Sequence, residues 1–343
     1  MTPLNTATDA VLSIENLQVA FPAGGRDVLA ANEVNLAVGA GEIVGLIGES
    51  GSGKSVTCRA VLGLVPFPGR VIGGRIRFGE RDLLGLTDAE LRRVRAQELG
   101  MIFQDPFSSL NPVQRVGDQL METLTVNLRL GRAAARAEAA DLVSAVGLTD
   151  ARRLLASYPH ELSGGMRQRI MIALATAARP RLLIADEPTT ALDVTTQARI
   201  LELLTRLRRV MGMAILLVSH DFGVIAETCD RVAVMYAGHI VEQGPVDSVY
   251  RRSEHPYTQA LLRSIPSLAS AVTRTPRQTI GGQPPDLADL PPGCPFAPRC
   301  PHVRPACRDV TMELERAGDH LTACPFVRSL PEVASKAAAG ASM

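Results

Sequence analysis

One octapeptide, Gly48-Glu49-Ser50-Gly51-Ser52-Gly53-Lys54-Ser55, constrains this chain more than any other stretch. It fits the pattern G-x-x-x-x-G-K-[ST], follows an apolar run at residues 43–47, and precedes a helix-like stretch at residues 55–62. The glycines let the backbone turn its N–H groups towards phosphate oxygens, and the following helix adds the positive end of its dipole. The sequence therefore predicts a strand, a phosphate-binding loop and a helix, as in an α/β P-loop nucleotide-binding fold.

The side chains of this loop have separate predicted roles. Lys54 would reach the β- and γ-phosphates of a nucleotide, and the hydroxyl of Ser55 would ligate Mg²⁺. The alternative is a glycine- and serine-rich turn that binds nothing, which the register of strand, loop, Lys-Ser pair and helix disfavours. The residues expected to line the nucleotide are Gly48, Ser50, Gly51, Gly53, Lys54, Ser55 and Val56.

Composition bounds the class of protein. The chain has 343 residues, 46% of them apolar, which is enough for a core and for two or three folding units. Its net charge of +1 implies no bulk attraction to nucleic acid or anionic lipid. A run of about 18 apolar residues, as a membrane-spanning helix needs, is missing. Residues 1–10 are polar and lack a signal pattern, so we expect a cytosolic location.

The hydrophobic pattern changes along the chain. Residues 11–21 and 34–38 alternate apolar and polar positions, which predicts antiparallel strands flanking the phosphate-loop strand. From 106 to 179, Ala, Arg and Leu at helical spacing indicate a mainly helical insertion. Continuous apolar runs at 182–186 and 214–219, with a helix between them, indicate a parallel sheet covered on both faces.

The acidic residues Asp186 and Glu187 stand at the end of the apolar run that begins at residue 182. In a phosphate-loop fold such a strand runs beside the loop strand, with its carboxyl end at the nucleotide. Asp186 would then hold Mg²⁺, and Glu187 would polarise an attacking water. Adjacent acids are common on solvated surfaces, so this assignment depends on the phosphate loop.

A second candidate anion site lies at Leu162-Ser163-Gly164-Gly165-Met166. Ser163 is a natural N-cap for the helix that follows, and Gly164 and Gly165 expose backbone N–H groups at its start. One chain has no evident use for two such sites. We interpret this stretch as completing the nucleotide site of a partner subunit; the alternative is an ordinary capped helix.

The order of these motifs resembles that of the ATPase subunits of ABC transporters. The family motifs over residues 11–244 are the phosphate loop at 48–55, the Q-loop Gln104, the signature at 162–166, the Walker B run at 182–186 with Glu187, the D-loop at 191–193 and the switch His220. Met166 replaces the usual glutamine, and Ser-Gly-Gly-Met-Arg-Gln-Arg is typical of the peptide-importer branch. Phe21 falls where the family places the aromatic that stacks on adenine; a core phenylalanine is the alternative.

Further stretches look like the ATP-binding subunits of dipeptide and oligopeptide importers. They are residues 185–194, Met235-Tyr236-Ala237-Gly238 and the His-Pro-Tyr stretch at 255–262. Nickel, glutathione and cationic-peptide importers share this subunit type, so the solute stays open.

The resemblance implies a mechanism with two ATPase subunits closed head to tail. Each nucleotide lies between the phosphate loop of one subunit and Ser163, Gly164 and Gly165 of the other. Glu187 would be the general base, His220 would orient the γ-phosphate, and Asp193 would link the two sites. Gln104 would sense Mg²⁺ and water, so the Mg²⁺ ligands would be Ser55, Gln104 and Asp186.

The resemblance also implies partners and a division of the chain. The partners would be a second, related ATPase subunit, two permease subunits at the cytoplasmic face of the bacterial inner membrane and, indirectly, an external solute-binding protein; nucleic acid is not expected. The expected regions are an ATPase core with an antiparallel β subdomain at 1–105 and 180–250, a helical signature subdomain at 106–179, a C-terminal extension at 251–328 and a disordered tail at 329–343.

Cysteine usage separates into two groups. Six cysteines in a cytosolic nucleotide-dependent protein predict no disulfides, and Cys58 and Cys229 stand alone in apolar contexts as predicted core residues. The other four, Cys294, Cys300, Cys307 and Cys324, share a proline-rich segment with little core, which a metal would hold most economically. Spacing alone favours zinc, although the C-x2-C knuckle is missing.

Residues 293–301, with the cysteine pattern around them, look like the C-terminal domain that binds a 4Fe-4S cluster in some dipeptide-importer ATPases. The resemblance therefore implies an iron–sulfur cluster on these cysteines, with a structural or regulatory role. His302 and His320 are further candidate ligands, and four free structural cysteines are the alternative.

Two other classes of function compete with an importer ATPase. A soluble ABC-type ATPase acting on nucleic acid or the ribosome usually carries long coiled coils or a second cassette, and this chain has neither a sustained heptad run nor a second phosphate loop. A regulator that only binds nucleotide is disfavoured by Glu187 and His220.

Overall fold

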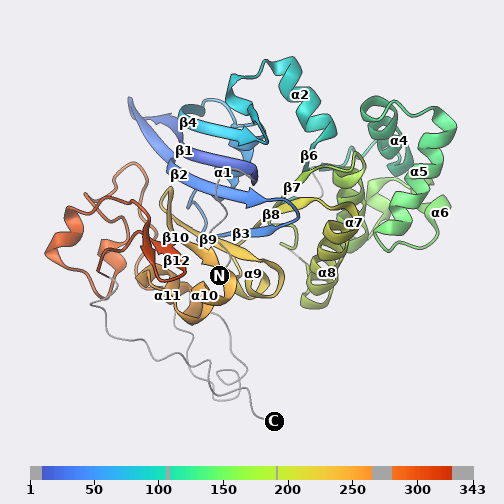
Figure 1. The fold of residues 1–343 in the computed structure, drawn as a ribbon. Helices are drawn as coiled ribbons and strands as arrows, with labels where there is room; N and C mark the ends of the chain where they lie inside the picture. The colour runs from blue at the N-terminus through green and yellow to red at the C-terminus, as the bar shows by residue number, and fades with distance from the viewer. Residues whose placement is uncertain (1–9, 106–108, 191, 265–279, 327–343) are drawn as a thin grey trace, which may run out of the picture.

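Two β-sheets organise the chain (Figure 1). The computed structural model describes residues 10–105, 109–190, 192–264 and 280–326. A four-stranded antiparallel sheet has the order β2-β1-β4-β5, and an eight-stranded mixed sheet has the order β11-β12-β10-β9-β3-β8-β7-β6. The strands are β1 Ala10–Ala23, β2 Arg26–Gly39, β3 Ile43–Ile47, β4 Arg70–Phe78, β5 Arg81–Asp82, β6 Leu99–Ile102, β7 Leu182–Asp186, β8 Ala214–Ser219, β9 Arg231–Tyr236, β10 His239–Pro245, β11 Glu315–Ala317 and β12 His320–Thr322.

Helices cover the large sheet and form a separate group at one side of the molecule (Figure 1). They are α1 Lys54–Val61, α2 Asp88–Gln97, α4 Val116–Asn127, α5 Arg132–Ala145, α6 Ala151–Ala156, α7 Gly164–Thr176, α8 Val194–Met211, α9 Phe222–Thr228, α10 Val246–Arg251 and α11 Pro256–Ser264. Within the described ranges of the chain, no helix is both long and apolar enough to cross a bilayer.

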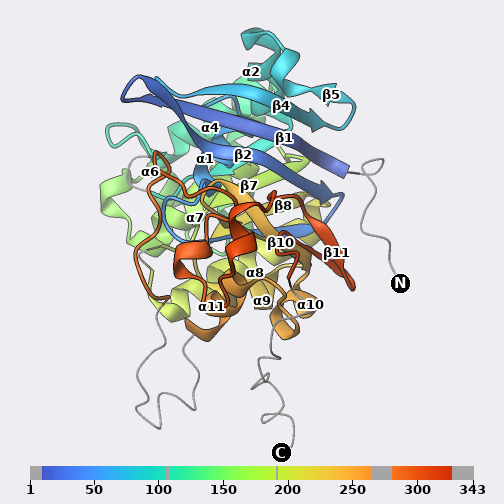
Figure 2. The same ribbon diagram turned by 90° about the vertical axis from the view of Figure 1, so that its left-hand side faces the viewer.

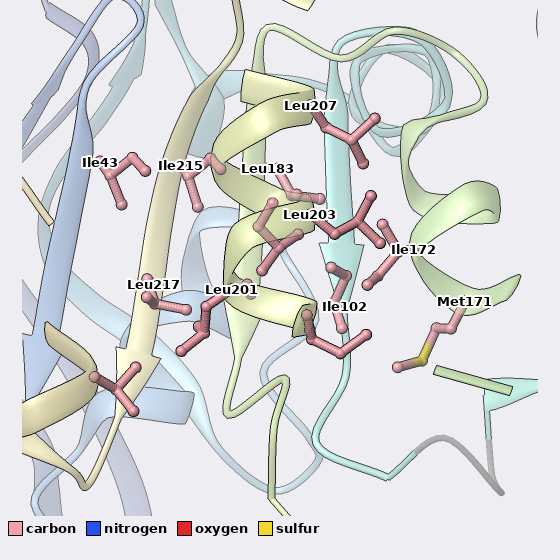
Figure 3. Close-up of a cluster of buried hydrophobic side chains, with 14 of the residues drawn as sticks. Ile43, Ile102, Met171, Ile172, Leu183, Leu201, Leu203, Leu207, Ile215 and Leu217 are labelled. Atoms are coloured by element: carbon pink, nitrogen blue, oxygen red, sulfur yellow. The ribbon is translucent and has the colours of Figure 1, made fainter. Parts of the chain in front are cut away.

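The centre of the large sheet is parallel and buried on both faces, as the apolar runs predict. The strands β9, β3, β8, β7 and β6 pair in parallel. Successive residues of β8 alternate between two cores: Ile215 and Leu217 belong to one, and Leu216 to the other. Figure 3 shows the first core, in which Ile215 and Leu183 of the sheet pack against Leu203 and Leu207 of α8.

The predicted antiparallel strands are confirmed, but they pair with one another in a sheet of their own and not with β3. The strands β1 and β2 are joined by a tight turn in which Gly24 and Gly25 have φ angles of 58° and 78°. Such positive φ angles favour glycine, which is why the chain reverses here. The alternating pattern gave the strands, while their sheet partners depend on tertiary packing.

The helical insertion contains α4, α5, α6 and α7, which pack on one another. In Figure 1 its helices α4 to α6 lie at the side opposite the C-terminal segment. Pro106 and the next two residues lie outside the described part of the chain, so the predicted boundary at 106 stays a prediction, as do the other regional boundaries.

The C-terminal segment joins the core sheet. Strand β12 pairs with β10 through Glu242 opposite Thr322, and β11 pairs with β12. Figure 2 looks onto this segment, which lies over β10. Next to this pairing, Nε2 of His320 lies 3.2 Å from Oε1 of Glu242 in a buried ion pair. The tail at 329–343 lies outside the described residues.

Candidate nucleotide-binding site

The phosphate loop connects β3 to α1 and is built where only glycine fits. Gly53 has a φ of 105°, and a Cβ placed on it would lie 2.2 Å from the carbonyl oxygen of Ala30. A Cβ on Gly48 would lie 2.1 Å from the carbonyl oxygen of Met235. Neighbouring backbone therefore crowds the loop on two sides, so the glycines are needed for its path as well as for approach to phosphate.

Lys54 lies inside the curl of this loop. Its Nζ donates to the carbonyl oxygens of Gly48 and Glu49, each at 2.8 Å. Burial lowers the pKa of Lys54, while the carboxylates of Glu187 and Asp186 act in the opposite direction. The ammonium thus lies at the loop carbonyls beside two acids, in the place from which a lysine can contact nucleotide phosphates.

The two predicted Mg²⁺ ligands Ser55 and Asp186 lie together. The Ser55 hydroxyl donates to Oδ1 of Asp186 at 3.0 Å. Burial raises the pKa of Asp186; the hydrogen bond from Ser55 opposes that rise, and the neighbouring Glu187 adds to it. A hard cation that takes hydroxyl and carboxylate oxygens would relieve the cost of burying this charge.

The predicted catalytic side chains Gln104 and His220 both lie close to one carboxylate oxygen of Glu187. Gln104 donates to its Oε2 at 3.1 Å, and Nδ1 of His220 lies 3.3 Å from the same atom. The hydroxyl of Thr190 also donates to it, at 2.8 Å. Glu187 itself has a φ of 48°, a strained conformation for a residue with a side chain. The sequence predicted Gln104, Glu187 and His220; it missed Thr190, three residues after Glu187.

The signature stretch begins α7 as predicted. Ser163 is the N-cap, and its hydroxyl accepts the N–H of Met166 at 3.4 Å. Among the described residues, no hydrogen bond joins Ser163, Gly164 or Gly165 to the phosphate loop. Gln168 ties the same helix to the segment after Glu187 by donating to the carbonyl of Pro188. The structure therefore brings the signature helix to the catalytic segment, and not to the phosphate loop of its own chain.

The remaining predicted nucleotide residues lie on several different elements. Asp193 caps α8 by accepting the N–H of Thr196 at 3.0 Å. The ring of Phe21 packs on the turn at Gly69, where an added Cβ would lie 2.4 Å from it. Ser50 and Gly51 are exposed at the loop tip, and Val56 is half-buried in α1. Ala191 of the D-loop lies outside the described residues. The roles of all these residues stay predictions.

The four C-terminal cysteines line a common cavity, together with Phe296. All six cysteines of the chain lie in described segments, and each has a free thiol. Burial raises the pKa of Cys294 to about 11, and it also raises the pKa of Cys300 and Cys324. Within the described segments no three His, Cys, Asp or Glu side chains converge on the site of a single metal ion.

Each of these sulfurs has a backbone N–H as a neighbour. The N–H of His302 donates to Sγ of Cys300 and that of Arg304 to Sγ of Cys307, each at 3.4 Å. Backbone hydrogen bonds from Phe296 and Phe326 lower the pKa of Cys294 and Cys324 against the effect of burial. Donors aimed at sulfur stabilise thiolate, which is the form that binds metals.

Two contacts to the phosphate loop were not predicted from the sequence. Arg299 forms an ion pair with Glu49 of the loop, and the N–H of Glu49 donates to the hydroxyl of Tyr257 at 2.9 Å. Tyr257 belongs to the His-Pro-Tyr stretch, which served only as a family marker. No local pattern indicates a contact between residues more than 200 positions apart.

Two sequence families match this chain. The family described as "ABC transporter" matches residues 31–190, and the family described as "Oligopeptide/dipeptide transporter, C-terminal region" matches residues 241–307. The first range contains the phosphate loop, Gln104, the signature and Glu187. The second contains the His-Pro-Tyr stretch, Arg299 and three of the four clustered cysteines.

Curated relatives match over most of their length. The oligopeptide transport ATP-binding protein OppD of Escherichia coli is 48% identical over 317 residues, which is 92% of this chain and 93% of that protein. The dipeptide transport ATP-binding protein DppD of Bacillus subtilis is 46% identical over 319 residues, 92% of this chain and 94% of the relative.

Solved ATP-binding cassettes share the fold. The dimeric ATP-binding cassette MJ0796, in a post-hydrolysis state bound to ADP and phosphate, superposes with a TM-score of 0.62 at 27% identity, covering 68% of this chain and 98% of that one. The cassette cbiO1 of Clostridium perfringens, part of the transporter complex cbiONQ, gives a TM-score of 0.62 at 26% identity, covering 72% and 92%.

Proposed function

This chain belongs to the ABC transporter family of ATPase subunits, and we propose that it hydrolyses ATP to power the import of oligopeptides or dipeptides. The single observation that carries the catalytic assignment is the convergence of Gln104, Thr190 and His220 on Oε2 of Glu187. The names of its relatives, which are oligopeptide and dipeptide transport proteins, support the solute class.

In the proposed reaction, Mg²⁺ and ATP are bound between the phosphate loop and the end of β7. Ser55 and Asp186 would ligate Mg²⁺, with Gln104 as a third contact, and Lys54 would leave the loop carbonyls for the β- and γ-phosphates. Glu187 would accept a proton from the attacking water, and His220 would orient the γ-phosphate. Most of the rate enhancement would come from positioning and electrostatic stabilisation.

The signature would act on the nucleotide of a partner subunit. Ser163, Gly164 and Gly165 present the N-terminus of α7 without a hydrogen bond to their own phosphate loop, which supports a site shared between two chains. Asp193 and the exposed Val194 begin α8 beside the catalytic segment and would link the two sites. We propose a heterodimer with a related ATPase subunit.

The transport complex would contain two permease subunits, against which this chain lies at the cytoplasmic face of the inner membrane. Solute selection would belong to the permeases and to an external binding protein. A nickel, glutathione or cationic-peptide importer remains the alternative within the same subunit type.

The test is solute-dependent ATP hydrolysis by the complete transporter in proteoliposomes. Dipeptides, longer peptides, glutathione and nickel are compared at matched concentrations, with a complex containing Glu187→Gln as the control. Peptide-dependent hydrolysis and uptake are expected. Stimulation by nickel or glutathione alone would overturn the solute class while leaving the ATPase assignment intact.

For the C-terminal cysteines we propose a 4Fe-4S cluster held by Cys294, Cys300, Cys307 and Cys324. Their shared cavity and the backbone donors at their sulfurs support four thiolates acting together. Burial favours the protonated thiols, and the positive charge of the bound cluster would take the place of these protons. The cluster would also cross-link a segment that has little hydrophobic core. A structural or regulatory role fits this position.

A further inference from the structure

A partly buried ion pair joins the C-terminal segment to the phosphate loop. Arg299 ends a short 3-10 turn directly before Cys300, and Glu49 is the second residue of the loop motif. Both ends of the guanidinium fork bind the carboxylate: Nη1 lies 2.6 Å from Oε2, and Nη2 lies 3.0 Å from Oε1. The side chain of Arg299 is only 5% exposed and that of Glu49 is 24% exposed, so solvent screens the pair weakly.

Other contacts fix the orientation of Arg299. Its Nε donates to the carbonyl oxygen of Gly281 at 2.8 Å, and Nη1 also donates to the hydroxyl of Tyr236 at 3.3 Å. The guanidinium carbon lies 5.9 Å from the centroid of the Tyr236 ring. Because the planar guanidinium is held by several partners, it can direct the Glu49 carboxylate to one place.

The backbone of Glu49 is held from the same side. Its N–H donates to the hydroxyl of Tyr257 at 2.9 Å. The Tyr257 ring packs on Tyr236 and Phe296, with centroid distances of 4.5 Å and 5.4 Å. Glu49 is therefore held twice, through its side chain by Arg299 and through its backbone by Tyr257, and both partners are more than 200 positions away in the sequence.

These anchors act on the lysine that is proposed to bind phosphate. The carbonyl oxygen of Glu49 accepts a hydrogen bond from Lys54 Nζ at 2.8 Å. A change in the position of Glu49 therefore changes the path of the loop and the place of the Lys54 ammonium. The same anchors lie next to the cysteines, because Phe296 and Cys300 flank the short turn that ends at Arg299, and both line the cysteine cavity.

We propose that Arg299 is a positioning residue for nucleotide binding, through which the four-cysteine segment holds the phosphate loop and sets the affinity of the chain for ATP. The contact itself needs only the described residues. Its dependence on a filled cysteine site rests on the proposed iron–sulfur cluster.

The test is the dissociation constant for Mg-ATP, measured by titration calorimetry on the full chain in a Glu187→Gln background that prevents turnover. The variants are Arg299→Gln, Arg299→Lys, Glu49→Gln and the Glu49→Gln/Arg299→Gln double variant. Arg308→Gln is the matched control, because Arg308 follows Cys307 as closely as Arg299 precedes Cys300 but is exposed. Urea midpoints and iron content are recorded for each variant.

We expect Arg299→Gln to weaken ATP binding about 5- to 150-fold, the usual range for coupling between two sites. Arg299→Lys should restore part of the affinity, since it keeps the charge but loses the fork. The double variant should bind no more weakly than the weaker single variant, because both changes remove one contact. Arg308→Gln should bind as the parent does.

Wild-type affinity in Arg299→Gln or in Glu49→Gln, at unchanged iron content, would overturn the proposal. If Arg299→Gln does not fold, Glu49→Gln tests the same contact from the loop side. A parent chain that binds no Mg-ATP would overturn the proposed function as well.

A second comparison tests the link to the cysteines. Anaerobic iron chelation should weaken ATP binding in the parent and change it little in Arg299→Gln, in which the contact is already lost. Equal ATP affinity before and after chelation of the parent would overturn the link between the cysteine site and ATP binding. The role of Arg299 would then be decided by the affinities of the variants alone. A parent purified without iron would overturn the cluster proposal and, with it, the link.

Discussion

The hydroxyl of Ser55 donates a 3.0 Å hydrogen bond to Oδ1 of Asp186, although the two residues are 131 positions apart in the chain. Ser55 is the second residue of α1, and Asp186 ends β7. The strand β8 separates β7 from β3, the strand that leads into the phosphate loop, so the expectation that β7 runs directly beside the loop strand is wrong. The parallel order of these strands therefore brings their carboxyl ends, and the two oxygen ligands, to one edge of the sheet.

This pair predicts the effect of removing one oxygen ligand. Ser55→Ala and Asp186→Asn should each lower Mg²⁺-dependent ATP hydrolysis at least about 100-fold, because the metal no longer positions the phosphates. Ser144→Ala on α5 serves as the control, since that hydroxyl donates only to the carbonyl of Ala140. Hydrolysis is measured over a Mg²⁺ titration. Parental rates in either variant at limiting Mg²⁺ would contradict the assignment of the ligands.

Glu187→Gln should abolish turnover and retain ATP binding. The amide keeps the size of the side chain but cannot accept the proton of the attacking water, so kcat should fall by roughly 100-fold to 10,000-fold. The exposed Glu227 of α9 provides the control Glu227→Gln. Phosphate release under single-turnover conditions and calorimetric titration with Mg-ATP separate hydrolysis from binding. Full hydrolysis by Glu187→Gln would show that another group is the base.

Gly53→Ala should distort the phosphate loop. The native φ of 105° is unfavourable for alanine, and the new Cβ would lie 2.2 Å from the Ala30 carbonyl oxygen. We expect the free energy of unfolding to fall by at least about 1–2 kcal/mol, together with a loss of ATP affinity. Gly85→Ala is the control, because a Cβ there meets no atom within 4 Å. Equal urea midpoints for the two variants would contradict this account.

A pH-dependent contact secures β12 to the core sheet. Burial opposes charging of His320, but the attraction and hydrogen bonding of Glu242 and Asp319 outweigh it and raise the pKa of His320. Since the folded pKa lies above the unfolded value, the stabilisation is fully present below about pH 6.5 and is lost as pH rises through the folded pKa.

His320→Gln should therefore destabilise the chain by about 1.5–3 kcal/mol at pH 5.5 and by less at pH 8.5, as measured by urea unfolding. The exposed His160 gives the control variant His160→Gln, which is unfolded in urea at the same two pH values. A larger destabilisation by His320→Gln at pH 8.5 than at pH 5.5 would reverse the sign and refute the account.

The sequence predicts those parts of the site that are local in the chain. The Gly-rich loop and Ser163 as an N-cap both act within a few residues, and the structure contains both. Motif order added Gln104 and His220, whose meeting at Glu187 depends on the order of strands in the sheet.

What the sequence could not predict depends on long-range packing. Alternation identified β1 and β2 but not the sheet in which they pair. The contact of Glu49 with Arg299 joins residues 250 positions apart, and neither residue belongs to a local pattern that indicates a partner. Contacts of this kind follow only from the way in which the C-terminal segment folds back over β10.

The four C-terminal cysteines give the final prediction. Anaerobically purified chain should contain iron and acid-labile sulfide and have a brown chromophore, and serine at Cys294, Cys300, Cys307 or Cys324 should remove all three. Cys229→Ser should retain them, because Cys229 packs against Gly45 and α9, away from the cavity. The four cysteines line one cavity, which is why each substitution is expected to act on the same site. One zinc per chain without iron would contradict the cluster, and the absence of metal would leave four structural thiols.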